Sequence, residues 1–157
     1  ESARSGFGEQ AVFSFDQPIA LQAFVVDTYL HRLNAPLSCH LFGLAPGHDL
    51  TNSMRSIPRW SVQLARGERI VPDDFQSYMQ GRHYAKQGQP WPDALIIQLD
   101  QSHSLDWQPL LPFQALKPDT YHHFDTFETT GWFQHLLFLH YPNGGIHGLK
   151  AFGDYKI

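Results

Sequence analysis

The sequence predicts an all-β domain whose strands pair as an antiparallel sandwich or barrel. Aromatic residues make up 14% of the chain, which also contains 11 prolines and 12 glycines. This composition favours short strands joined by turns over a helical bundle. Short apolar runs, without repeated helices between them, indicate the same class. At 157 residues the chain is long enough for one domain with its own hydrophobic core.

Six apolar runs are expected to form strands, because their side chains alternate or are β-branched and turn residues separate them. These runs are residues 11–15, 19–30, 37–44, 94–99, 134–141 and 145–152. The separating residues are Asp16-Gln17-Pro18, Asn34-Ala35-Pro36, Ala45-Pro46-Gly47 and Asn143-Gly144-Gly145. The last of these predicts a tight hairpin between the final two strands, because its residues accept positive φ angles.

Residues 46–106 fit this strand pattern least well, since they are rich in polar residues, glycine and proline. We interpret them as a long irregular insertion between two core strands. Within it, residues 72–81 predict one short helix, with Asp73 at its start and Gly81 at its end. Long loops in compact domains often carry function.

Charge and hydropathy exclude two classes of partner. The formal net charge is -4 with only 11 Lys and Arg residues, so the chain has no basic surface for nucleic acid. No apolar stretch approaches the roughly 20 residues of a membrane-spanning helix. Cys39 is the only cysteine, so no internal disulfide forms, and we expect a reducing compartment, the cytoplasm.

The C-terminal half carries two motifs at a characteristic separation. Residues 107–124 contain Trp-x-x-Leu-Leu-Pro, then a Pro-Asp turn, and then His-x-Phe at 122–124. Residues 141–146 read Tyr-Pro-Asn-Gly-Gly-Ile. Together these motifs resemble the repeat of the allantoicase family.

The N-terminal half resembles the same repeat more loosely. Glu1 and Arg4 match the end of a Trp-Glu-Thr-x-Arg segment, and residues 26–38 match a Val-Asp-Thr strand with its Asn-x-Pro turn. The resemblance therefore covers both ends of the chain and leaves out residues 46–106.

The resemblance implies a galactose-binding-like jelly-roll sandwich that occupies residues 1–157 as a single domain. It also implies hydrolysis of allantoate, a small ureide, to ureidoglycolate and urea. The family's enzymes use two such repeats per subunit, so we expect a second repeat or a homo-oligomer as partner. No residue set defines a cofactor, and a requirement for a divalent metal is left open.

Cleavage of the ureido C–N bond needs an activated water, a proton for the departing urea and donors for developing negative charge. Asp27 or Glu1 is the candidate general base, and His122 is the candidate acid–base group or metal ligand. Arg4 is the candidate clamp for the substrate carboxylate. Backbone amides of the turn are further candidates for anion binding, at Asn143, Gly144 and Gly145.

Structural roles compete with each of these assignments. Glu1 and Arg4 lie near the start of the sequence given, where side chains are often solvated. Asp27 is placed to bond backbone groups at a strand end. His122 and His123 are adjacent, so on a strand one faces inward and the other outward.

Two departures from the family pattern bear on activity. The family has Arg-Leu-Asn where this chain has Leu137-Phe138-Leu139, and Arg-Leu-Arg where it has Gly148-Leu149-Lys150. Leu137 and Leu139 share one face of a strand, so two polar positions on that face are lost. The competing hypothesis is therefore a non-catalytic module for carbohydrate or protein binding and assembly.

Overall fold

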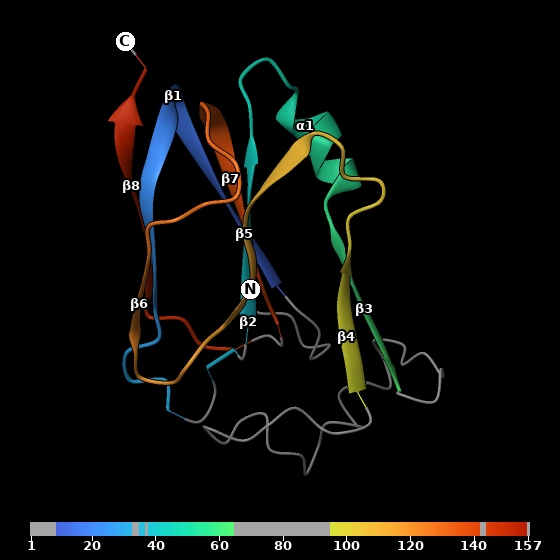
Figure 1. Ribbon diagram of the computed structural model, residues 1–157, viewed down its shortest axis with the longest axis vertical. Coiled ribbons are helices and arrows are strands. Elements are labelled where there is room, and N and C mark those ends of the chain that lie inside the picture. The colour runs from blue at the N-terminus through green and yellow to red at the C-terminus, as the bar shows by residue number, and fades with distance from the viewer. Residues whose placement is uncertain (1–8, 33–34, 37, 65–94, 142–143, 157) are drawn as a thin grey trace.

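The computed structural model describes residues 9–32, 35–36, 38–64, 95–141 and 144–156 (Figure 1). All strand pairs among these residues are antiparallel, and they build an all-β sandwich as the sequence predicts. The elements are β1 (Glu9–Asp27), β2 (Ser38–Leu44), α1 (Leu50–Ser53), the 3-10 helix η1 (Met54–Ser56), β3 (Arg59–Leu64), β4 (Leu95–Asp100), β5 (Trp107–Ala115), β6 (Tyr121–Phe124), β7 (Phe133–Tyr141) and β8 (Gly148–Tyr155).

Strand β1 is bent in its middle, and its two halves form an inverted V in Figure 1. The pairing with β7 shifts register between Ser14 and Ile19, on either side of the bend. The sequence predicted two strands there, separated by residues 16–18, whereas the structure contains one strand of 19 residues. The residues expected to end the first strand form a corner within β1 instead. Pro18 has no N–H and interrupts the ladder of hydrogen bonds, but its backbone remains extended.

The bend divides the main sheet into two layers. In the first layer, the N-terminal half of β1 pairs with β7, which continues through β2 to β5. In the second layer, the C-terminal half of β1 lies between β6 and β8. Phe24 of the second layer contacts Phe13 and Phe138 of the first, with ring centroids 5.8 and 5.7 Å apart. The main core therefore lies between the layers, with Phe24, Val26, Leu41, Leu111, Leu136 and Phe138 buried in it.

The predicted hairpin between the last two strands is wrong. Both β7 and β8 pair with β1, β7 with its first half and β8 with its second. The connection between Tyr141 and Gly148 thus carries the chain from one layer to the other. Asn-Gly-Gly chemistry indicates a reversal of the chain, but it does not specify which strand the returning segment joins.

Residues 46–106 join two neighbouring strands, β2 and β5, as the expected insertion between core strands does. Between turns and loops, their described parts contain α1, η1 and the antiparallel pair β3–β4. The short helix α1 lies at Leu50–Ser53, where Asp49 caps it by accepting a hydrogen bond from the Thr51 N–H. The helix predicted at residues 72–81 falls outside the described residues.

The insertion covers the outer face of the first layer. Leu137 and Leu139 project from that face and are buried in a second apolar cluster with Phe42, Leu44 and Trp107. Insertion residues that pack against this cluster are Leu50, Met54, Ile57 and Leu99. Trp107 also donates its indole N–H to the Ser53 carbonyl, at 2.9 Å, which ties the insertion to β5.

Strand β5 was not among the strands predicted from apolar alternation. It contains Pro109 and Pro112, which disfavour a strand by sequence criteria, and it ends the path of paired strands in the first layer. An edge position tolerates proline because one side of the strand needs no ladder hydrogen bonds. Among the described residues, no helix has the length and apolar character needed to cross a membrane.

A substitution in β2 tests the packing of β2 against its neighbour β7 in the first layer. A Cβ atom on Gly43 would lie 2.5 Å from the Phe133 ring, whereas one on Gly148 would meet nothing within 4 Å. We expect Gly43→Ala to lower the free energy of unfolding by about 1–3 kcal/mol through overpacking. Gly148→Ala, the matched control, should change it by less than about 0.5 kcal/mol. Urea unfolding of both variants measures the difference; equal values would contradict the close approach of Phe133.

Candidate functional site

The described residues of the predicted site gather at one end of the sandwich, the lower end in Figure 1. Asp27 ends β1, His122 lies in β6, and Gly144 and Gly145 precede β8. The His147 N–H donates to the Asp27 carbonyl at 2.8 Å, which holds the segment before β8 against the end of β1. Glu1, Arg4 and Asn143 lie outside the described residues.

Thr28 joins the end of β1 to the turn that precedes β6. Its side chain is fully buried, and its hydroxyl donates to the Lys117 carbonyl at 2.6 Å and accepts from the Thr120 N–H at 3.0 Å. The Thr28 backbone N–H donates to the Thr120 carbonyl. The threonine of the Val-Asp-Thr motif therefore has an architectural role.

His122 joins the same two segments. Its Nε2 accepts from the Lys117 N–H at 2.8 Å, so that nitrogen carries no proton. The proton is on Nδ1, which donates to the Val26 carbonyl at 3.0 Å. Burial lowers the pKa of His122, and the Val26 hydrogen bond and the Asp27 charge oppose that shift only in part. His122 is therefore a neutral imidazole with both ring nitrogens bonded to backbone.

The predicted catalytic pair, Asp27 and His122, lies on opposite faces of the second layer. Val26 pairs with His122, and Asp27 pairs with Tyr121, so the two side chains point to opposite sides of the sheet. His122 faces the core, as its half-buried position beside Val26 indicates. His123, which is exposed, shares the outer face with Asp27.

The outer face beside Asp27 carries polar side chains around an open space. We call Asp27, Tyr121, His123, Gly148 and Lys150 the outer patch. Gly148 pairs with Asp27, and the position that a Cβ would occupy on it is open. The Lys150 ammonium lies over the Tyr121 ring, 5.4 Å from its centroid.

The geometry of the outer patch brings a carboxylate and an ammonium group onto one exposed face. Asp27 is half-buried, and its Oδ1 accepts from the Tyr29 N–H at 2.9 Å, which orients the carboxylate. His123 and Lys150 flank Val25, which is fully buried beneath them. The sequence analysis did not single out Lys150 as a site residue, although it replaces the second arginine of the family's Arg-Leu-Arg.

Gly145 has a steric role. A Cβ there would overlap the His31 imidazole ring, so the glycine makes room for His31. Its assignment to anion binding, like that of Gly144, stays a prediction. Within the described part of the chain, no group of three or more His, Cys, Asp or Glu residues has the arrangement of a metal site.

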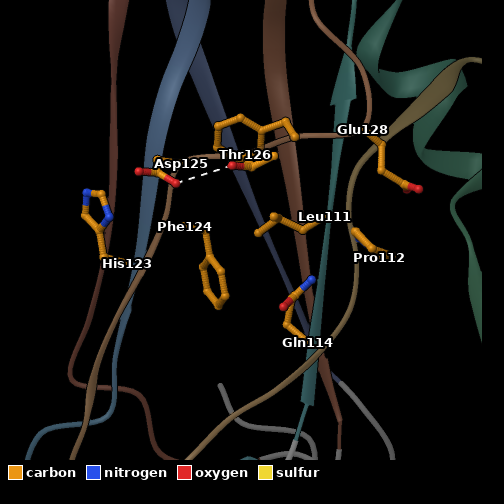
Figure 2. A pocket seen from close by; sticks show the side chains of 9 residues that line it. Leu111, Pro112, Gln114, His123, Phe124, Asp125, Thr126 and Glu128 are labelled. Carbon is orange, nitrogen blue, oxygen red and sulfur yellow. Dashed lines mark hydrogen bonds between the residues drawn. The ribbon is translucent and has the colours of Figure 1, made fainter.

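A pocket of about 510 Å³ lies elsewhere on the domain, between β5 and β6 (Figure 2). None of the sequence-predicted site residues lines it. Of the outer patch, His123 also lines this pocket, so the two sites adjoin there.

The fold and the outer patch define a class: a two-layer antiparallel β-sandwich with a polar site at the end of one layer. The chain matches the family model described as allantoicase repeat over residues 1–156. It therefore belongs to the allantoicase repeat family. The match also spans residues 46–106, which the resemblance from sequence left out. Comparison with curated proteins and with solved structures gave no significant match.

Thr28 offers a test of the architectural role. Thr28→Val keeps the shape of the side chain but leaves the Thr120 N–H and the Lys117 carbonyl without their hydroxyl partner. We expect a loss of about 1–3 kcal/mol in the free energy of unfolding, measured by chemical denaturation. Thr130→Val, at an exposed position, is the matched control. A Thr28 variant as stable as this control would show that the turn is held by other contacts.

His40 makes stability depend on pH. It lies on the outer face of the first layer beside Phe42 and Phe113, and burial lowers its pKa from 6.5 to about 4. Between these values the unfolded chain binds a proton that the folded chain does not, so stability falls as pH falls. We expect the full contribution above pH 6.5 and a loss of about 3 kcal/mol on acidification to pH 4.

The measurement is urea unfolding across this pH range for the wild type and His40→Phe. Phenylalanine keeps an aromatic ring between Phe42 and Phe113 but does not titrate, so the variant should lose less stability in acid. Identical pH profiles would exclude His40 as a source of the dependence.

Proposed function

We propose that this chain is the repeat of an allantoicase-type hydrolase that cleaves allantoate to ureidoglycolate and urea. One observation carries the proposal: the Asp27 carboxylate and the Lys150 ammonium flank the open space above Gly148 on one exposed face. An anionic ureide needs a cation for its carboxylate and a base for the attacking water. Membership of the allantoicase repeat family supports this choice of substrate.

In this proposal, water supplies the hydroxyl group that replaces urea on the substrate carbon. Asp27 takes a proton from the water as the hydroxyl group bonds to that carbon, and the bond from the carbon to the ureido nitrogen breaks. His123 gives a proton to the departing nitrogen, and Lys150 binds the substrate carboxylate. The backbone amides of Asn143, Gly144 and Gly145 are the proposed donors for further negative charge.

His122 has a positioning role in this proposal. Both of its ring nitrogens bond backbone groups, so proton transfer through His122 would require one of these bonds to break. It holds the end of β1, and therefore Asp27, against the turn before β6. Glu1 and Arg4 remain proposed as a second carboxylate and a second cation for the site.

We also propose that a second repeat, or a second copy of this chain, covers the outer patch. The patch lies on the exposed outer face of a sheet, and binding sites often form where domains or subunits meet. Phe152, 48% exposed, continues the face beyond Lys150 and supplies apolar area for such a contact. A cytoplasmic location and a divalent metal are compatible with this chemistry and are parts of the proposal to be tested.

The second candidate function is a non-catalytic module for carbohydrate or protein binding. Two observations favour it. Leu137 and Leu139 replace polar residues of the family pattern and are buried beneath the insertion, so no ligand reaches these two positions. Gly148 replaces the first arginine of Arg-Leu-Arg, which leaves Lys150 as the cation of the outer patch.

Urea release from allantoate, with and without added divalent metal, tests the enzyme hypothesis. We expect Asp27→Asn to lower turnover by roughly 100-fold or more, while its amide oxygen still accepts from Tyr29 and keeps the fold. Lys150→Met should raise KM for the anionic substrate. Lys156→Gln, a charge loss at an exposed position outside the patch, is the matched control and should leave both constants unchanged.

Substitutions of the adjacent residues His122 and His123 distinguish a positioning role from a catalytic role. His123→Gln should lower turnover without changing the melting temperature, whereas His122→Gln should lower stability together with activity. Activity per chain should rise with protein concentration if a second copy completes the site. A wild-type protein that releases no urea under any of these conditions would reject the hydrolase in favour of the binding module.

A further inference from the structure

The pocket in Figure 2 lies at the seam where the edges of the two layers approach each other. Leu111, Pro112 and Gln114 come from β5, the edge of the first layer. Phe124 comes from β6, the edge of the second layer, and residues 125–128 follow it. The volume, about 510 Å³, falls within the range of roughly 300–1,000 Å³ that small-ligand sites occupy.

The walls of the pocket are held by hydrogen bonds to backbone carbonyls of β5. The Glu128 N–H donates to the Leu110 carbonyl at 2.9 Å, and the Thr129 hydroxyl donates to the Pro109 carbonyl at 2.8 Å. These bonds fasten the segment after β6 across to β5. The pocket is therefore formed without a ligand, as most small-molecule sites are.

The floor of the pocket is apolar. Leu111 is buried, and Phe124 and Phe127 pack against the main core cluster. In Figure 2 Leu111, Phe124 and Gln114 surround the open space, while His123 stands apart at its margin. A flat apolar body would cover this floor and displace water from it.

The charges of the pocket are negative. Asp125 and Glu128 are exposed carboxylates on its lining, and no lysine or arginine lines it. Asp125 accepts a long 3.4 Å hydrogen bond from the Thr126 hydroxyl. Neither carboxylate is among the ion pairs of the described residues. Both carboxylates are therefore accessible to a ligand, and they repel anions such as allantoate.

We propose that this seam pocket is a second binding site, for a small organic cation with a flat apolar body, such as an aryl amidinium or aryl amine. The apolar floor takes the body of the ligand, and the cationic group lies against one of the two carboxylates, Asp125 or Glu128, which stand on opposite sides of the open space in Figure 2. There its N–H groups donate to carboxylate oxygens. Gln114 adds a polar group at the opposite margin. The site adjoins the outer patch at His123, but Asp27 and Lys150 do not line it, and it does not depend on the hydrolase proposal.

Binding of benzamidine to the full chain tests the proposal, with benzamide and benzoate as neutral and anionic ligands of the same shape. We expect benzamidine to bind at one site and to perturb the amide NMR signals of residues 111–114 and 124–128. The neutral ligand should bind about tenfold more weakly, because it lacks the charge that strengthens these hydrogen bonds. Benzoate should not bind there.

The carboxylates are tested by Asp125→Asn and Glu128→Gln, of which the one that neutralises the partner of the amidinium should weaken benzamidine binding about tenfold. Unchanged affinity in both variants would contradict the proposal. Asp16→Asn removes the same charge at the exposed corner of β1, outside the pocket, and should not change the affinity. Urea release from allantoate should be the same in all three variants and the wild type, which separates this site from the proposed catalytic one.

Three results would overturn the proposal: equal affinity for benzamidine and benzamide, signal changes away from the seam, or no binding up to about 10 mM ligand. Binding of an oligolysine peptide without binding of benzamidine would also overturn it and would identify an acidic docking surface for a basic protein segment. The wild-type NMR measurement decides the location of binding even if a variant fails to fold.

Discussion

The rest of the structure depends on the bend in β1. One half of this strand belongs to the first layer and the other half to the second, so the two layers are connected covalently and held at a fixed separation. Phe13 and Phe24, on the two halves of that strand, face each other across the core at a centroid distance of 5.8 Å. Strand β1 pairs with β7 on one side of the bend and with β6 and β8 on the other. Through β7 it also positions β2 and β5, which complete the main sheet.

The residues of the family motifs have two different roles in this fold. Thr28 and His122 are bonded to backbone groups at the lower end of the sandwich and hold the turn before β6 in place. Their immediate neighbours, Asp27 and His123, face outward in the outer patch. A strand alternates its side chains, so one short motif supplies an architectural residue and an outward-facing polar residue at the same time.

The insertion changes which surfaces of the domain a ligand reaches. It covers the outer face of the first layer, where Leu137 and Leu139 match its apolar residues. The outer face of the second layer keeps a carboxylate, a histidine and a lysine beside an open position at Gly148. The leucines at 137 and 139 thus lie on the covered part of the first layer, whereas the proposed site lies on the second layer.

The sequence by itself determined the all-β class, the family, most strand positions and the residues of the motifs, because alternation, turn chemistry and motif spacing are local properties of the chain. It missed β3, β5 and β6, of which β5 is an edge strand obscured by its prolines. It also joined β7 to β8, since a turn sequence does not specify the partner of the returning strand. Only the tertiary structure decided that His122 faces the core while His123 and Lys150 share the face of Asp27. That arrangement depends on the register between strands distant in sequence, and register is set by packing between the two layers.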